Sequence, residues 1–115
     1  LLGLTASKTT VSRNEQFDVG YRYINVGTDA FNGQTGAALV DNNNNIVAVL
    51  RSWNTSNYVV GARNSNPVNI TCTVPNTVTP GRYRLRMVVR PTGGEWRIAT
   101  ISVEGSPTSI DFTVR

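Results

Sequence analysis

The sequence is dominated by short segments in which apolar and polar residues alternate one by one. The clearest of them are residues 17–23, 68–74, 82–90 and 110–115. Successive side chains of a β-strand point to opposite faces, so this alternation predicts strands with one buried face. Less regular strand candidates are residues 5–11, 36–40, 46–50 and 96–103. We find no segment with the 3.6-residue apolar period of an amphipathic helix.

Turn signals separate these segments. Asp41 and the four asparagines after it lie between two apolar runs, and residues 92–95 contain a Gly-Gly pair typical of a hairpin. The commonest residues are Val, at 15, and Thr, at 14, and both favour strands. We predict a single domain over residues 1–115, an all-β, two-sheet antiparallel immunoglobulin-like sandwich of about eight strands. A closed barrel is the alternative.

Tyr83 follows the turn sequence Thr79-Pro80-Gly81. In immunoglobulin-like sandwiches, a tyrosine near the start of one strand donates a hydrogen bond to backbone a few residues upstream and holds a corner. We therefore predict that Tyr83 is a structural corner, with an ordinary inward-facing aromatic as the alternative. The chain lacks the paired cysteines of antibody domains, because Cys72 is its single cysteine.

Three stretches near the end of the chain carry a resemblance to a known group. They are residues 81–86, 93–96 and 110–114. They resemble β-sandwich modules of secreted or surface proteins of the Bacteroides–Porphyromonas group, similar to the modules C-terminal to streptopain-like cysteine peptidases. The resemblance implies an extracellular or cell-surface accessory module for spacing, docking or adhesion, cut from a longer secreted protein. Its partner would be a neighbouring domain of the same parent chain or another surface protein.

Catalytic and metal-binding patterns are weak. The chain has no histidine, and Cys72 lies on the apolar face of its predicted strand, where a free cysteine behaves as a small buried hydrophobe. Residues 41–45 begin like a calcium loop but lack the glycine and the final carboxylate that such a loop requires. We therefore expect no enzyme activity, no cofactor and no metal. No run of residues approaches the roughly 18 apolar residues of a membrane span.

The arginines are the most distinctive chemical feature. Residues 1–57 carry four basic and four acidic side chains, whereas residues 58–115 carry seven and three, so the net charge of +4 belongs to the second half. The alternation places Arg82, Arg84, Arg86 and Arg90 on one face of a strand, and we expect Arg97 to join them from the next strand. Arginine suits bidentate contacts with carboxylate, phosphate or sulfate. An anion-binding or partner-binding face is therefore one hypothesis, and a solvated outer face is the alternative.

Three aromatic residues give another hypothesis. Trp53, Tyr58 and Trp96 flank predicted turns, where exposed rings would form a sugar-stacking platform, unless they pack internally. Three functions therefore stay open: an accessory module, a module that binds carbohydrate, including acidic polysaccharide, and an inhibitor or protein-binding domain that uses a loop at 54–66. We do not expect nucleic acid binding, because no aromatic platform lies among the arginines.

Overall fold

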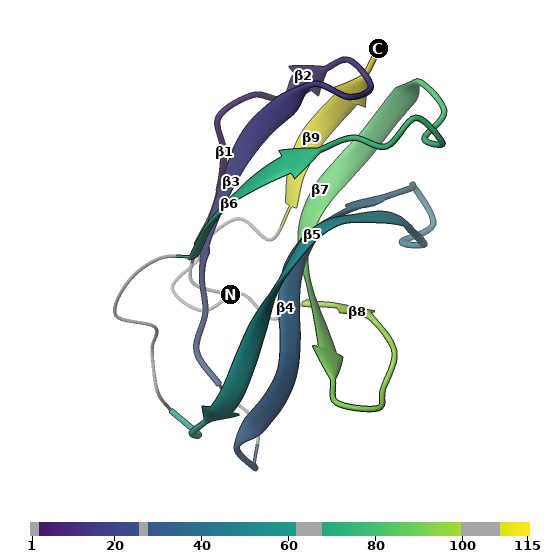
Figure 1. Cartoon of the computed structure of the whole chain (residues 1–115). Coiled ribbons are helices and arrows are strands. Elements are labelled where there is room, and N and C mark those ends of the chain that lie inside the picture. Colours follow the sequence, from purple (N-terminus) through teal and green to yellow (C-terminus); the bar gives the residue numbers. More distant parts are fainter. Residues whose placement is uncertain (1–2, 26–27, 62–67, 100–108) are drawn as a thin grey trace.

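The computed structural model describes residues 3–25, 28–61, 68–99 and 109–115 (Figure 1). These residues form nine strands and no helix. The strands are β1 (Gly3–Ala6), β2 (Thr10–Val11), β3 (Gln16–Arg22), β4 (Phe31–Val40), β5 (Ile46–Tyr58), β6 (Val68–Thr73), β7 (Gly81–Pro91), β8 (Arg97–Ile98) and β9 (Ser109–Val114). The predicted all-β class is confirmed.

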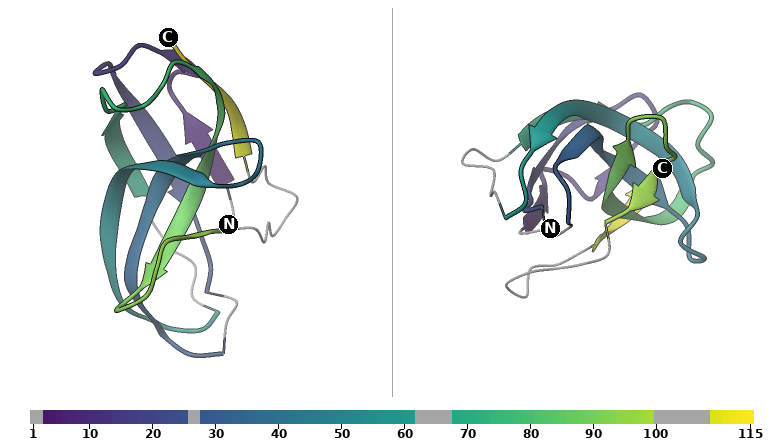
Figure 2. Two further views of the ribbon diagram at one scale, coloured as in Figure 1. Left: turned by 90° about the vertical axis from the view of Figure 1, so that its right-hand side faces the viewer. Right: turned by 90° about the horizontal axis from the view of Figure 1, so that it is seen from below.

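The strands form two sheets that face each other (Figures 1 and 2). One sheet has the order β1-β3-β6, and the other has the order β2-β9-β7-β4-β5, with β8 attached to β7. All pairs are antiparallel except β2 with β9, which is parallel. The segment 5–11 is therefore not one strand: β1 pairs with β3 in the smaller sheet, and β2 pairs with β9 in the larger one.

The core lies between the sheets and consists of the apolar members of the alternating segments. Phe17 from β3 and Phe112 from β9 pack with ring centroids 5.0 Å apart. Leu85 and Met87 of β7 are 0% and 2% exposed, and each such side chain contributes roughly 1.5–3 kcal/mol on burial. Cys72 is fully buried in the same core, as the sequence predicted.

The asparagine-rich turn closes the hairpin between β4 and β5. The Asp41 carboxylate accepts hydrogen bonds from the backbone N–H groups of Asn43 and Asn45, each at 2.9 Å, and Asn44 has a positive φ of 61°. The two strands are longer than the sequence predicted, because the polar residues after Leu50 continue β5 to Tyr58. Register shifts interrupt their pairing at two places near the turn. The hairpin curves over the outer side of the larger sheet (Figure 2).

Candidate functional site

Tyr83 anchors the start of β7, the strand that carries most of the arginines. Its hydroxyl donates a hydrogen bond to the carbonyl oxygen of Thr79, four residues upstream. This is the contact expected of a tyrosine corner. The ring also packs against the core, so the alternative interpretation of Tyr83 as an inward-facing aromatic describes the same side chain.

Four arginines occupy alternate positions of β7 and share its outer face. Across the pairing with β9, Arg82 lies opposite Thr113, Arg84 opposite Asp111 and Arg86 opposite Ser109. Across the pairing with β4, Arg90 lies opposite Gln34. The side chains differ in exposure, because Arg82 and Arg90 are exposed whereas Arg84 is half-buried. The sequence therefore placed these residues on the correct face, but the face is not uniform.

Arg86 departs from the prediction of an exposed arginine face. Its side chain is buried, with 8% of the residue exposed, and its Nε has no hydrogen-bond partner among the residues that the structure describes. Burial, together with the neighbouring positive charge of Arg84, lowers the pKa of Arg86. It sits between β9 and β4, and the outer-face residues Ala38 and Val88 beside it are also fully buried. Arg86 is therefore largely covered and is less available for a surface contact than Arg82 or Arg84.

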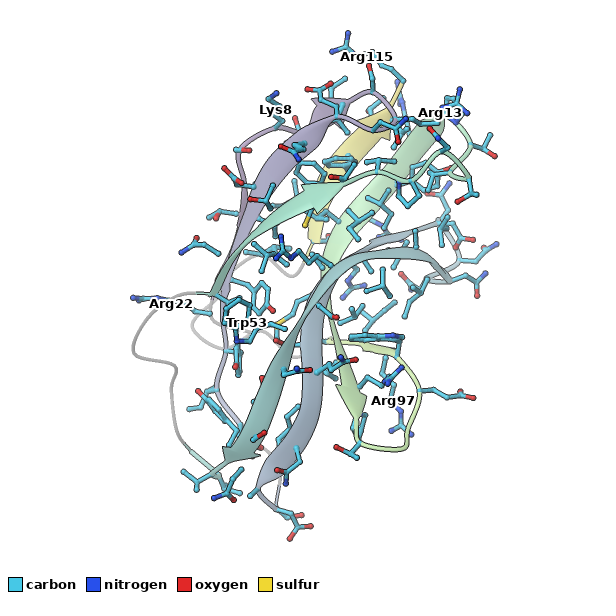
Figure 3. All side chains as sticks on the ribbon, viewed as in Figure 1. Lys8, Arg13, Arg22, Trp53, Arg97 and Arg115 are labelled. Atoms are coloured by element: carbon cyan, nitrogen blue, oxygen red, sulfur yellow. The ribbon has the colours of Figure 1, made fainter. Side chains whose placement is uncertain are left out.

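Arg97 does not join the arginine face. In the pairing of β8 with β7, Arg97 lies opposite Val89, whereas Val88 lies opposite Ile98. Directly paired residues share a face, so Arg97 projects on the side of Val89 and not on that of Arg90. Figure 3 labels Arg97, which lies at the hairpin between β7 and β8. Arg90 instead covers the ring of Trp96, with its guanidinium carbon 5.6 Å from the ring centroid, a cation–π contact.

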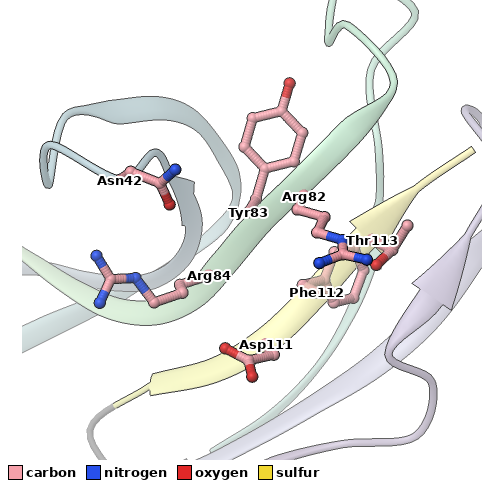
Figure 4. A pocket seen from close by; sticks show the side chains of 7 residues that line it. All are labelled: Asn42, Arg82, Tyr83, Arg84, Asp111, Phe112 and Thr113. Carbon is pink, nitrogen blue, oxygen red and sulfur yellow. The ribbon is translucent and has the colours of Figure 1, made fainter.

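A surface hollow of about 560 Å³ lies beside the remaining two arginines (Figure 4). Its lining residues come from β7, β9 and the hairpin turn: Asn42, Arg82, Tyr83, Arg84, Asp111, Phe112 and Thr113. Arg84 donates a hydrogen bond from Nη2 to the side-chain oxygen of Asn44 at 3.3 Å. We refer to this site, with Arg82, Arg84 and Asp111, as the arginine hollow.

The charges of the arginine hollow are not paired with each other. Asp111 lies directly opposite Arg84 in the sheet, but the two charged groups do not form an ion pair. Within the described part of the chain, the ion pair that does form joins Lys8 and Glu15, at 2.9 Å. Arg82 and Arg84 therefore keep guanidinium donors available to an anion from outside. Arginine presents these donors as a planar fork that matches a carboxylate.

The three aromatic residues of the proposed sugar platform lie in different surroundings. Trp53 is 51% exposed and belongs to β5, not to a turn. It lies opposite Thr35 of β4, which faces the core, so Trp53 is on the core-facing side of the sheet. Tyr58 packs on Tyr23, with ring centroids 4.9 Å apart, and donates a hydrogen bond to the Tyr23 carbonyl at 3.3 Å. Trp96 lies under Arg90, on the opposite side of the sheet from Trp53. The structure does not bring the three rings together.

The prediction of a binding loop at 54–66 is wrong for its first residues. Residues 54–58 are strand β5, paired with β4, and residues 62–66 lie outside the described residues. The candidate strand at 96–103 is seen only as β8, because residues 100–103 likewise lie outside them.

The groups that would serve catalysis or metal binding are few. Burial raises the pKa of the Cys72 thiol to about 11, so it carries little thiolate at neutral pH. Among residues 3–25, 28–61, 68–99 and 109–115, no group of three His, Cys, Asp or Glu side chains lies close enough to hold a metal ion. The same ranges contain no helix that is long and apolar enough to cross a membrane.

Comparisons with known proteins bear on the fold. No family model and no curated protein matches the sequence. A Niemann-Pick type C2 protein from the Japanese carpenter ant superposes with a TM-score of 0.54 over 97% of this chain and 89% of its own, at 9% identity. The chain has an immunoglobulin-like fold.

A second solved structure covers the chain as part of a larger protein. The alkylpurine DNA glycosylase AlkC of Pseudomonas fluorescens, bound to DNA with an abasic site analog, matches with a TM-score of 0.51 at 14% identity. The match covers 99% of this chain but 29% of the glycosylase, so the chain spans less than a third of that protein. At these identities the two likenesses concern the fold alone.

Proposed function

We propose that this chain is a non-catalytic accessory module that docks an acidic segment of a protein partner in the arginine hollow. The observation that carries the proposal is the pair of arginines, Arg82 and Arg84, beside an open hollow, with no carboxylate of the described residues bound to either. A carboxylate from a partner would find two guanidinium forks there. Charge-assisted contacts of this kind are stronger than neutral hydrogen bonds.

A protein partner fits the hollow better than a polysaccharide that is anionic throughout. Asp111 lies in the same hollow and would repel a densely sulfated chain. A protein surface can place a carboxylate near the arginines and a hydrogen-bond donor near Asp111 and Asn42. The separation of Trp53 from Trp96 also removes the stacking platform that a sugar-binding module would use.

The non-catalytic part of the proposal is supported by the chemistry of the side chains. The chain has no histidine, and its single thiol is buried and protonated at neutral pH. The extracellular part of the proposal depends on the resemblance to surface modules. In that setting the partner is a neighbouring domain of the same parent chain or another surface protein, and exposure to added protease on intact cells tests the location.

The docking proposal is tested with three polyanions of different chemistry: a glutamate-rich peptide, heparin and a DNA duplex. The DNA duplex is included because the matching glycosylase is bound to DNA. Binding of each is measured by fluorescence anisotropy at low and moderate salt. We expect the glutamate peptide to bind and to weaken as salt rises, because the contacts are ionic.

Matched variants locate the binding surface. The double variant R82Q/R84Q should weaken peptide binding roughly two- to thirty-fold, because two exposed ion pairs contribute about 0.2–1 kcal/mol each. The control R13Q/R97Q removes the same charge elsewhere and should have a smaller effect. D111N should strengthen heparin binding, because it removes the repelling carboxylate. Equal losses in the two double variants, or heparin preferred over the peptide in the native chain, would refute a protein-docking hollow.

A further inference from the structure

Arg84 and Asp111 are neighbours in the sheet, yet their charges do not pair. The two residues lie directly opposite each other in the antiparallel pairing of β7 with β9, where Cβ atoms are about 4.5–5.5 Å apart. Side chains of this length can meet across that distance. In the described part of the chain, however, Arg84 and Asp111 form no ion pair. Another contact must therefore hold the guanidinium of Arg84 away from the carboxylate.

The turn between β4 and β5 supplies that contact. Arg84 donates a hydrogen bond from Nη2 to Oδ1 of Asn44 at 3.3 Å. Figure 4 shows Arg84 extending from β7 toward the turn that carries Asn42, whereas Asp111 lies on β9. Backbone N–H donors of the turn lower the pKa of Asp41, and the positive charge of Arg84 lowers it further. The guanidinium of Arg84 is thus attracted to the turn by an amide oxygen and by a carboxylate.

The turn also fixes the position of Asn44. Its φ is 61°, in the left-handed region that asparagine tolerates better than most residues. Its backbone N–H donates a hydrogen bond to the carbonyl oxygen of Asp41 at 3.1 Å. The carboxylate of Asp41 in turn accepts the backbone N–H groups of Asn43 and Asn45, each at 2.9 Å. The side-chain oxygen of Asn44 is therefore placed beside β7 by the backbone of its own turn.

One hydrogen bond of this kind is enough to decide where the guanidinium lies. Exposed ion pairs contribute little, because water screens the charges and two long side chains lose freedom. A hydrogen bond with one charged partner is stronger than a neutral one. Arg84 is half-buried whereas Asp111 is exposed, so water solvates the carboxylate of Asp111 at little cost. The contact with Asn44 therefore competes successfully with the ion pair across the sheet.

We propose that Asn44 is a positioning residue, which holds Arg84 away from Asp111 and thereby keeps the arginine hollow available to an acidic partner. An ion pair between Arg84 and Asp111 would neutralise the hollow from within, and a partner carboxylate would first have to displace Asp111. The consequence for docking rests on the proposed function. The position of the guanidinium does not, and it is measured on the chain alone.

NMR signals of the arginine side chains test this position without a partner. N44G removes the side-chain oxygen, and glycine adopts a positive φ freely, so this variant should fold with a thermal midpoint close to the native one. In the native chain, D111N should change the Nε–H signal of Arg84 little. In N44G, D111N should change that signal strongly, because Arg84 has then moved to Asp111. An equal response to D111N in the two backgrounds would overturn the proposal.

Two matched variants separate the side chain of Asn44 from the turn as a whole. N44D keeps an oxygen at the same position, so the Arg84 signal should respond to D111N as weakly as in the native chain. N43G removes the neighbouring amide side chain, while the backbone N–H at that position can still reach Asp41, and it should also behave as the native chain does. A response in N43G as large as in N44G would overturn the assignment to Asn44.

Binding of the glutamate-rich peptide tests the consequence for docking. N44G should bind the peptide roughly 1.5- to five-fold more weakly than the native chain, because an exposed internal ion pair must first break. N44G/D111N should bind no more weakly than D111N, because the internal pair cannot form there. The same weakening in both backgrounds would refute the role of Asn44. If the native chain does not bind the peptide, the docking proposal fails, whereas the NMR comparison still decides whether Asn44 positions Arg84.

Discussion

Tyr21 and Thr35 share a hydrogen bond inside the core, and its energetics are the sharpest test of the described packing. The two hydroxyl oxygens are 2.7 Å apart, and the residues are 1% exposed each. Tyr21 comes from β3 in the smaller sheet and Thr35 from β4 in the larger one, so the bond joins the two sheets. Burial raises the pKa of Tyr21 to about 12, and the hydrogen bond from Thr35 opposes that rise in part.

Removal of either hydroxyl alone should be costly. Tyr21→Phe leaves the Thr35 hydroxyl buried without its partner, and Thr35→Val does the same to the Tyr21 hydroxyl. A buried unsatisfied polar group costs about 1–3 kcal/mol, whereas replacing both groups with apolar ones of similar shape is nearly neutral. The double variant should therefore be more stable than either single variant and close to the native chain, so the coupling free energy should be about 2 kcal/mol or more.

Urea unfolding of the four proteins measures this cycle. The free energies of unfolding are comparable if the four chains unfold in two states with the same dependence on urea. Tyr21→Phe combined with Tyr83→Phe is the control, because Tyr83 bonds Thr79 at a different site, and this pair should be additive within about 0.5 kcal/mol. An additive Tyr21–Thr35 pair would refute the assigned hydrogen bond.

Four further predictions concern single residues. Tyr83→Phe should lower the free energy of unfolding by about 1 kcal/mol in urea. Folding raises the pKa of Cys72 from 9.0 to about 11, so the free energy of unfolding should fall as the pH rises between these two values. It should fall less in Cys72→Ala, and equal pH profiles of the two proteins would contradict this. Backbone donors lower the pKa of Asp41, so Asp41→Asn should destabilise the chain at pH 7 but not near pH 2. Arg86→Met should raise the thermal midpoint, because it replaces a largely buried guanidinium whose Nε has no hydrogen-bond partner among the described residues.

Much of the fold follows from the period of two in the sequence. Where one face of a strand is buried, as in β3, β6, β7 and β9, the alternation identified both the strand and its core residues. It missed the second half of β5, because residues 51–58 are mostly polar and form an edge, where no apolar pattern is required. It also merged β1 with β2, because a change of sheet leaves no mark on local alternation.

The candidate site shows where local pattern stops being informative. Alternation places Arg82, Arg84 and Arg86 on one face, since that depends on β7 alone. The exposure of each arginine also depends on which other segments cover it. One of these is the curved β4–β5 hairpin, whose position the local sequence of β7 does not determine. The side of Arg97 depends on the register across the turn at 92–95, which one residue more or less would reverse. Two of the five predicted arginines therefore do not contribute to the exposed face. Arg97 points to the other side because of its pairing register, and Arg86 is covered by its neighbours.

The distribution of charge on β7 has a functional consequence. A strand whose arginines were all exposed would present a uniform cationic stripe, suited to any polyanion. Enclosure of Arg86, the contact of Arg90 with Trp96 and the presence of Asp111 instead leave two available guanidinium groups next to one carboxylate. Such a mixed site discriminates by the position of charges more than by their number. The docking proposal therefore predicts that this site prefers a specific acidic protein surface to a polyanion.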